Sequence, residues 1–174
     1  IPTRVKQLVW GKDNVGQFLW KTTARISAYA ANRIPEIADT IVEIDNAIKW
    51  GFGWEIGVFE TWDAIGVAES VERMKAEGMK VPANVQAMLD SGATSFYKYE
   101  NGTKSFYDFT TNAYKQIADK QGVIVLKSVK DRIGVIKSNK GASLIDIGDG
   151  VACLEFHSKM NSIGSDTMSM MKFA

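Results

Sequence analysis

The sequence predicts a mainly α-helical domain followed by two β-hairpins. Over the first half of the chain, to about residue 92, apolar residues recur at steps of three and four, the period of an amphipathic helix. Beyond that point apolar and polar residues alternate. The pairs Asn101-Gly102 and Asp149-Gly150 stand between alternating segments, as expected of tight hairpin turns.

The first long helix is predicted to begin at Asp13 or Asn14, because both residue types cap helices well. Pro35 falls within the helical pattern, where a proline removes a backbone donor and crowds the preceding turn. The helix therefore either stops near Asn32 or kinks, and the continuing pattern over residues 36–39 favours the kink. The residues that form its apolar stripe are Phe18, Leu19, Ile26, Tyr29, Ala30 and Ile37.

A second helix follows, with Asp45 and Lys49 as an outward pair one turn apart and Gly51 as its left-handed stop. Its inward residues are Ile41, Ile44 and Ile48. Three shorter helices are then predicted over 59–66, 67–78 and 82–92. The middle one directs Val67, Val71 and Met74 inward, and Pro82 suits the first helical position of the last.

Each hairpin has a register fixed by its turn. The Asn101-Gly102 turn pairs Tyr99 with Lys104, Tyr97 with Phe106 and, on the other face, Phe96 with Tyr107. The Asp149-Gly150 turn pairs Ile147 with Ala152 and Ile145 with Leu154, which gives one apolar face. Two strands cannot bury such a face alone, so we expect this segment either to fold back on the helices or to pair with another copy in a homodimer. The stretch 110–141 between the hairpins carries little pattern and is interpreted as a linker.

Composition excludes several classes of function. The 21 basic and 20 acidic residues leave a net charge of +1, which argues against nucleic-acid binding. No apolar run is long enough to span a bilayer, and the single cysteine, Cys153, suits a reducing compartment, so a cytoplasmic protein is expected. The chain lacks an initiating Met, and Ser165 and Asp166 begin a helix just before the sequence stops. We expect a piece of a longer protein.

The residues offer no catalytic or metal site. His157 is the only histidine, and neither a nucleophilic triad nor a zinc site can be assembled around it and Cys153. Neither a Gly-rich dinucleotide motif nor a Walker motif occurs, so no cofactor-binding residue is assigned. The carboxylates of Glu43, Asp45, Glu69 and Glu72 are expected on solvent faces.

An aromatic cluster is the unusual feature. It consists of Trp50, Phe52, Trp54, Phe59 and Trp62. Aromatic residues at this density form a core, a subunit contact or, as a third option, the wall of a ligand pocket. Core packing is the favoured interpretation.

The segment NAIKWGFGWEIGVFETWDAIG resembles the signature of the C-terminal domain of 3-hydroxyacyl-CoA dehydrogenases, in which a helix ends in a glycine-rich loop and Gly-Pro-Phe-Glu begins the next. Gly57, Phe59 and Glu60 match, while Val58 replaces the proline. The resemblance covers roughly Val15 to Phe109. It implies a small helical bundle over residues 1–109.

Residues 142–174 resemble the opening of an enoyl-CoA hydratase of the crotonase superfamily. The loop usually written Asn-Arg-Pro-Lys-Ala-x-Asn falls on residues 157–161, where Lys159 and Asn161 match. The resemblance implies contacts to an acyl-CoA substrate at Lys159 and Met160.

Together the two resemblances imply an interior piece of a bifunctional fatty-acid β-oxidation enzyme. The parent is expected to oxidise 3-hydroxyacyl-CoA with NAD and to hydrate 2-enoyl-CoA. This piece is expected to bind no cofactor and to be catalytically inactive, because the NAD domain and the hydratase oxyanion hole lie outside it. The rival hypothesis is a non-enzymatic helical module that docks a partner through its Trp-rich loop.

Overall fold

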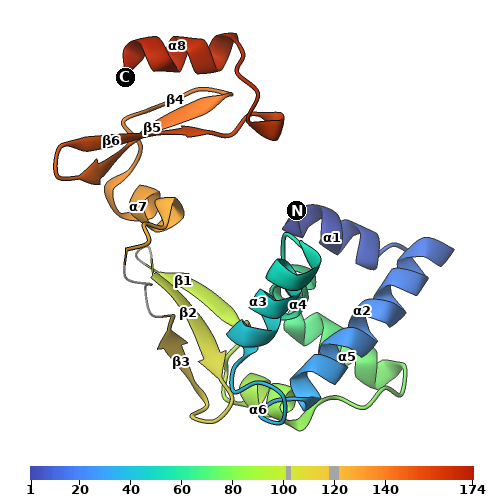
Figure 1. The fold of residues 1–174 in the computed structure, drawn as a ribbon. Coiled ribbons are helices and arrows are strands. Elements are labelled where there is room, and N and C mark those ends of the chain that lie inside the picture. The colour runs from blue at the N-terminus through green and yellow to red at the C-terminus, as the bar shows by residue number, and fades with distance from the viewer. Residues whose placement is uncertain (101–102, 118–121) are drawn as a thin grey trace. The chain divides into compact units, whose positions relative to one another are not determined.

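The computed structural model describes residues 1–100, 103–117 and 122–174. They form two compact units. Unit 1 comprises Ile1–Lys98 with Lys104–Ile117, and unit 2 comprises Tyr99–Thr103 with Ala118–Ala174. The mainly α fold class predicted from the sequence is confirmed, with two small antiparallel sheets added to the helices (Figure 1).

Unit 1 is a bundle of six helices with most of a three-stranded sheet, whose residues Tyr99, Glu100 and Thr103 are grouped with unit 2. The helices are α1 (Pro2–Val9), α2 (Asn14–Asn32), α3 (Ile41–Phe52), α4 (Val58–Ile65), α5 (Val67–Ala76) and α6 (Ala83–Asp90). The sheet has the order β1 (Tyr97–Glu100), β2 (Thr103–Asp108), β3 (Ala113–Gln116). Asp13 caps α2, as predicted, by accepting a hydrogen bond from Gly16 N at 2.7 Å. Val67, Val71 and Met74 of α5 are buried, also as predicted.

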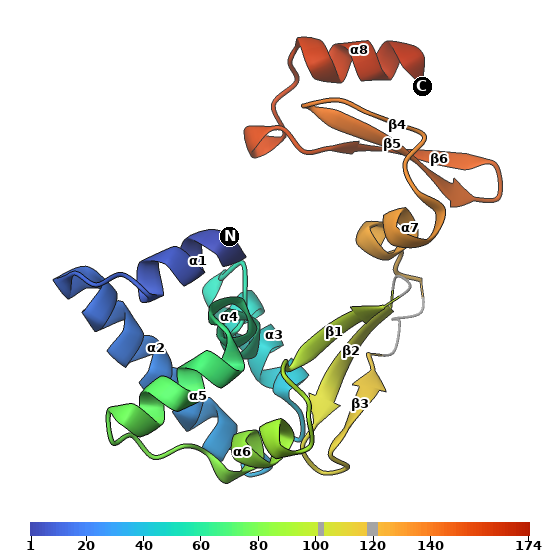
Figure 2. The ribbon, with the colours of Figure 1, turned by 180° about the vertical axis from the view of Figure 1, so that it is seen from behind.

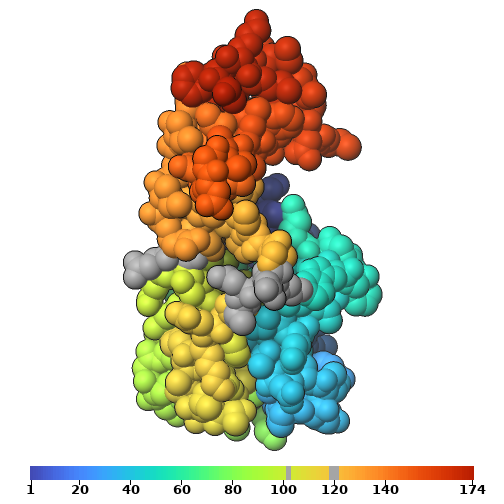
Figure 3. Space-filling view, turned by 60° about the vertical axis from the view of Figure 1, so that its left-hand side comes forward, coloured from blue at the N-terminus to red at the C-terminus, as the bar shows by residue number. Residues whose placement is uncertain are grey.

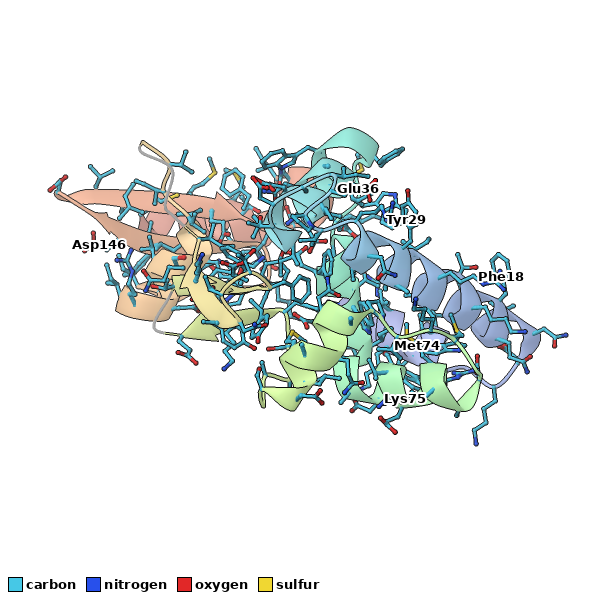
Figure 4. The ribbon with its side chains drawn as sticks, turned by 90° about the horizontal axis from the view of Figure 1, so that it is seen from below. Phe18, Tyr29, Glu36, Met74, Lys75 and Asp146 are labelled. Carbon is cyan, nitrogen blue, oxygen red and sulfur yellow. The ribbon has the colours of Figure 1, made fainter. Side chains whose placement is uncertain are left out.

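The buried face of α2 agrees with the predicted stripe only in part: Ala30 is buried and Leu19 packs against the core, but the bulkier members are not buried. Trp20, Ala24, Ala30 and Ala31 face the core, whereas the bulky stripe residues Phe18, Ile26 and Tyr29 are exposed. Figure 4 shows Phe18 and Tyr29 pointing outward from α2, with Met74 turned toward the interior of the bundle. Small residues let a helix approach its neighbours closely, and one fully buried indole supplies the apolar volume.

Helix α2 ends at Asn32, so the favoured kink at Pro35 is wrong and the alternative, a stop near Asn32, is right. A turn containing a cis Ile34–Pro35 peptide bond follows, and Ile37 is exposed. Helix α3 continues past the predicted stop at Gly51 to Phe52, and Gly53, with a φ of 67°, caps its C-terminal end.

The first sheet has one strand more than predicted. Tyr107 N donates to Phe96 O at 2.7 Å, which confirms that predicted pair, while the Asn101-Gly102 turn lies outside the described residues. Strand β3 pairs with β2, with Tyr114 opposite Tyr107. Tyr114 also donates from its hydroxyl to Ser95 O at 2.6 Å.

Unit 2 is a second three-stranded sheet with helices beside it. Its elements are α7 (Leu126–Ile133), β4 (Lys137–Ser138), β5 (Ala142–Gly148), β6 (Val151–Phe156), a 3₁₀ turn η1 (Lys159–Asn161) and α8 (Ser165–Phe173). The stretch 110–141, interpreted as a linker, contains β3, α7 and β4 among its described residues. Figure 3 shows the orange-to-red residues of unit 2 as a continuously packed body.

The predicted register of the second hairpin is wrong by one residue. Ile145 lies opposite Cys153 rather than Leu154, and Leu154 lies opposite Leu144. The cause is an irregularity between Asp146 and Gly148, which adds a residue to β5 next to the turn. Helix α8 packs on the sheet (Figures 1 and 2), with Met170 and Ile145 both buried, so the hairpin has a cover that the sequence analysis did not expect.

Candidate functional site

A buried carboxylate lies at the start of α4, within the segment that carries the dehydrogenase-like motif. Asp45 projects from α3 and is fully buried. Its two oxygens accept hydrogen bonds from Phe59 N at 2.8 Å and Glu60 N at 3.0 Å. Burial raises the pKa of Asp45, and the two backbone donors oppose that effect. The prediction of Asp45 as a solvent-exposed charge is therefore wrong: it satisfies amides that the first turn of α4 leaves without partners.

Glu60 fixes the same helix start from within α4. It accepts from Gly57 N at 2.9 Å, from Lys49 Nζ at 3.1 Å and from Lys104 Nζ at 2.6 Å. Burial acts to raise the pKa of Glu60, but the hydrogen bonds from Lys104 and Gly57 outweigh it and hold the pKa below its usual range. Lys49, predicted to pair with Asp45, pairs with Glu60 instead.

Asp63, one turn further along α4, holds the entry to β1. It accepts from Phe96 N at 2.7 Å and from Tyr97 N at 2.9 Å. Burial raises the pKa of Asp63 to about 7, and the neighbouring charge of Asp45 adds to the shift. The hydroxyl of Tyr97 in turn donates to Asp45 at 3.0 Å, and burial followed by this carboxylate raises the pKa of Tyr97 far above its ordinary value.

Gly57 is required by this arrangement. A Cβ at that position would overlap the side-chain carbons of Asp45. The carboxylate oxygens of Asp45, Glu60 and Asp63 accept hydrogen bonds from backbone amides, lysines and a tyrosine of the same unit. The network is chemically suited to holding residues 53–60 in one conformation.

Part of the aromatic cluster lies on or next to the loop between α3 and α4 that this network holds. Trp62 and Phe59 are fully buried, and Trp62 lies 5.3 Å from Phe96 between ring centroids. By contrast, Trp50, Phe52 and Trp54 are 70%, 74% and 52% exposed. Core packing is confirmed for the first two residues and wrong for the other three.

An apolar groove adjoins Trp54. Two hollows of about 180 and 250 Å³ share Leu19, Thr23, Trp54 and Thr61 as lining residues, so they are continuous along α2 and α4. Apolar walls with a few hydroxyls suit an alkyl chain or an apolar side chain. A pocket wall was the third option for the aromatic cluster, and Trp54 lines this groove; the wall formed by α2 was not predicted, because Leu19 and Ile26 were assigned to the core.

The residues implied as acyl-CoA contacts lie in unit 2. Lys159 and Met160 belong to η1, and Met160 is 91% exposed with a φ of 56°. His157 lies just before them, with its Nε2 at 3.0 Å from the hydroxyl oxygen of Ser143. Within the described ranges, no group of three or more His, Cys, Asp or Glu side chains is placed to hold a metal ion. In that same part of the chain, no helix is long and apolar enough to cross a membrane.

Comparison with known proteins gives one informative match. The chain is 46% identical over 168 residues to a "Probable 3-hydroxyacyl-CoA dehydrogenase" of Bacillus subtilis (strain 168). The aligned region is 97% of this chain and 21% of that protein, so the chain spans about a fifth of its relative's length. No family model and no solved structure matches.

This match agrees with the dehydrogenase resemblance predicted from the Gly57-Phe59-Glu60 motif. The relative's name does not mention a hydratase. Asp45, which holds this motif, and Asp63, which holds the entry to β1, were not identified in these roles from the sequence. A signal for Asp45 was available, since an aspartate in the stripe Ile41, Ile44, Ile48 lies on the inward side of a helix.

Proposed function

We propose that this chain is an interior, non-catalytic segment of a longer fatty-acid β-oxidation enzyme. The parent oxidises 3-hydroxyacyl-CoA to 3-oxoacyl-CoA with NAD and hydrates 2-enoyl-CoA. The observation that carries the proposal is the 46% identity over 97% of the chain to a protein named as a probable 3-hydroxyacyl-CoA dehydrogenase. The local structure supports it, because the motif residues at the start of α4 are held by hydrogen bonds to the carboxylates of Asp45 and Glu60.

The described residues contain no parallel, Rossmann-type dinucleotide-binding unit for NAD. Both sheets are antiparallel, whereas a dinucleotide-binding unit joins parallel strands through a helix and a glycine-rich turn. The proposal therefore assigns NAD binding and hydride transfer to parts of the parent outside this chain. Residues 1–109 form the helical support of the parent's dehydrogenase part. The groove beside Trp54 lines part of the pocket for the acyl chain of the substrate.

Residues 142–174 are proposed as the start of the hydratase, joined to the helical domain through 110–141. In support, β5 and β6 form the strand pair that the resemblance implies, and an exposed turn with Lys159 and Met160 follows them. We assign those two residues to contacts with the acyl-CoA substrate of the completed domain.

A second candidate is a non-enzymatic module that docks a partner through the Trp-rich loop. The exposed side chains of Phe52 and Trp54 favour it, since large apolar surfaces at a loop commonly mark a contact. The two candidates differ in what the surrounding gene encodes.

The decisive experiment expresses the complete open reading frame and measures NADH formation from 3-hydroxybutyryl-CoA and hydration of crotonyl-CoA. We expect both activities in the complete protein and neither in the 174-residue chain. A complete protein that lacks NAD-dependent oxidation contradicts the proposal and leaves the docking module. Turnover by the 174-residue chain contradicts its non-catalytic role.

A further inference from the structure

A hollow of about 810 Å³ lies apart from the groove, where the end of α1, the first turns of α2 and the end of α5 meet. Its lining includes the cations Lys12, Lys21 and Arg73, the carboxylate of Glu77 and the ring of Trp10. Neither the dehydrogenase motif nor the hydratase-like residues contribute to it. The volume is within the range of sites that take organic ligands.

The hollow carries an excess of positive charge. It has three cations and one carboxylate, so two positive charges remain. Glu77 is already satisfied, because Arg73 Nε donates to it at 2.8 Å and Trp20 Nε1 donates to it at 2.8 Å. These two hydrogen bonds, that of Arg73 first, lower the pKa of Glu77. Across residues 1–100, 103–117 and 122–174, neither Lys12 nor Lys21 is within ion-pair distance of a carboxylate.

The aromatic wall is held rigidly. Trp10 stacks on Trp20 with 5.6 Å between ring centroids, and Trp10 Nε1 donates to Ile65 O at 2.9 Å. The guanidinium of Arg73 lies over the Trp20 ring, 4.4 Å from its centroid. Because only Nε of Arg73 is bound to Glu77, its two terminal nitrogens stay available as a planar donor pair.

We propose that this hollow binds an adenine nucleotide through its phosphates. Lys12, Lys21 and the terminal nitrogens of Arg73 contact the phosphate oxygens, and the base lies against Trp10. Guanidinium and ammonium groups are the usual phosphate donors, and an indole offers a stacking face to any base. The choice of an adenine nucleotide rests on the proposed function, since CoA and NAD both carry one. The preference for a phosphorylated ligand rests on the charges alone.

A test titrates the 174-residue chain with CoA, 3′-dephospho-CoA, ADP and NAD, following tryptophan fluorescence and the heat of binding at low and high NaCl. We expect saturable binding that weakens as salt rises, because exposed charges are screened. Lys12→Gln and Lys21→Gln should each weaken binding about two- to fivefold, the effect of one exposed charge. Lys80→Gln, an exposed lysine outside the hollow, is the matched control and should bind like the unmodified chain.

The relative affinities for the four ligands identify which nucleotide the hollow recognises. Tighter binding of CoA than of 3′-dephospho-CoA assigns the site to CoA, whereas equal binding of ADP, NAD and CoA assigns it to the shared diphosphate. Absence of saturation, or the same loss in Lys80→Gln as in the two pocket variants, overturns the site. If the parent enzyme is active while this chain binds no nucleotide, only the site fails. If the chain binds nucleotide while the complete protein is inactive, the proposed function fails and the site stands.

Discussion

Trp54 and Trp62 lie eight positions apart in the sequence and in opposite surroundings. The Trp62 side chain is fully buried against Phe96, whereas Trp54 is 52% exposed at the rim of the groove. The residue type alone therefore does not tell how much a tryptophan contributes to stability. The two indoles differ in burial.

We predict that Trp62→Ala lowers the free energy of unfolding by about 3–5 kcal/mol, as expected for a large core aromatic. Trp54→Ala should lower it by less than about 1 kcal/mol, as expected for an exposed position. Urea denaturation followed by circular dichroism measures both, with each variant as the other's control. Equal losses of unfolding free energy in the two variants would contradict this difference in burial.

Asp63 makes stability depend on pH. Because its pKa is raised from 3.8 to about 7 by burial, the folded state binds a proton more tightly than the unfolded state. This contribution is fully present below about pH 4 and is lost as pH rises through 7. Asp45 shifts in the same direction. Glu60, Glu77 and Asp108 shift downward, so their contributions are lost only as pH falls through their folded values.

We predict that unfolding free energy increases as pH is lowered from about 8 to about 5, with an upper bound near 4 kcal/mol for a shift of three units. Asp63→Asn should flatten this dependence between pH 5 and 8, and Glu72→Gln, on an exposed face, should not. Thermal melts across that range provide the measurement. A wild-type profile that rises steadily with pH over this window would contradict the assignment.

At the scale of elements, local signals predicted some helix ends and missed others, since the favoured continuation of α2 past Asn32 and the stop of α3 at Gly51 were both wrong. The caps at Asp13 and Gly66 follow from residue type, and α4 and α5 lie where the sequence predicts them. The buried face of α2 was predicted only at Leu19 and Ala30, because several bulky apolar residues competed with the small residues that pack against the core. The register of β5 and β6 depended on an irregularity that alternation alone does not reveal.

Part of the site was predictable, and part was not. Gly57, Phe59 and Glu60 form a recognisable motif because they are contiguous. The supports of that motif come from α3 and from the connection to β1, at sequence separations of 14 and 33 residues. Strand β3 was missed for a similar reason, since Tyr114 is held by contacts to Tyr107 and Ser95 rather than by a local pattern.

Gly57→Ala tests the fit of α4 on α3. The new methyl group would overlap the buried side chain of Asp45, so we expect a loss of about 1–3 kcal/mol, typical of overpacking. Gly51→Ala is the matched control: it lies within α3 with open space around it and should gain about 0.5–1 kcal/mol. Chemical denaturation of both variants measures the difference, and a gain at position 57 would contradict the described packing.

At the scale of the whole molecule, each unit has its own buried residues. The hydrophobic core of unit 1 runs from Val9 to Tyr107 in sequence, and Ile145 and Met170 are buried within unit 2. A compact set of buried residues is what an independently folding domain requires.

We predict that a chain ending at Ile117 folds cooperatively and retains the near-ultraviolet circular dichroism of its buried aromatics. Sedimentation of the intact and shortened chains also tests the expected homodimer, because strand β6 is an edge of its sheet and Val151 on it is exposed. Loss of a dimer on shortening supports pairing through unit 2. A shortened chain without a cooperative transition contradicts the independence of unit 1.

The carboxylate of Asp45 also determines which elements of unit 1 unfold together. It connects α3 to the first amides of α4 and, through Tyr97, to β1. Separation of any one of these elements leaves a buried charge without its donors, which is costly in an apolar interior. The three should therefore exchange their amide protons with deuterium at one common rate, as a single opening unit, although residues 66–96 separate α4 from β1 in the sequence.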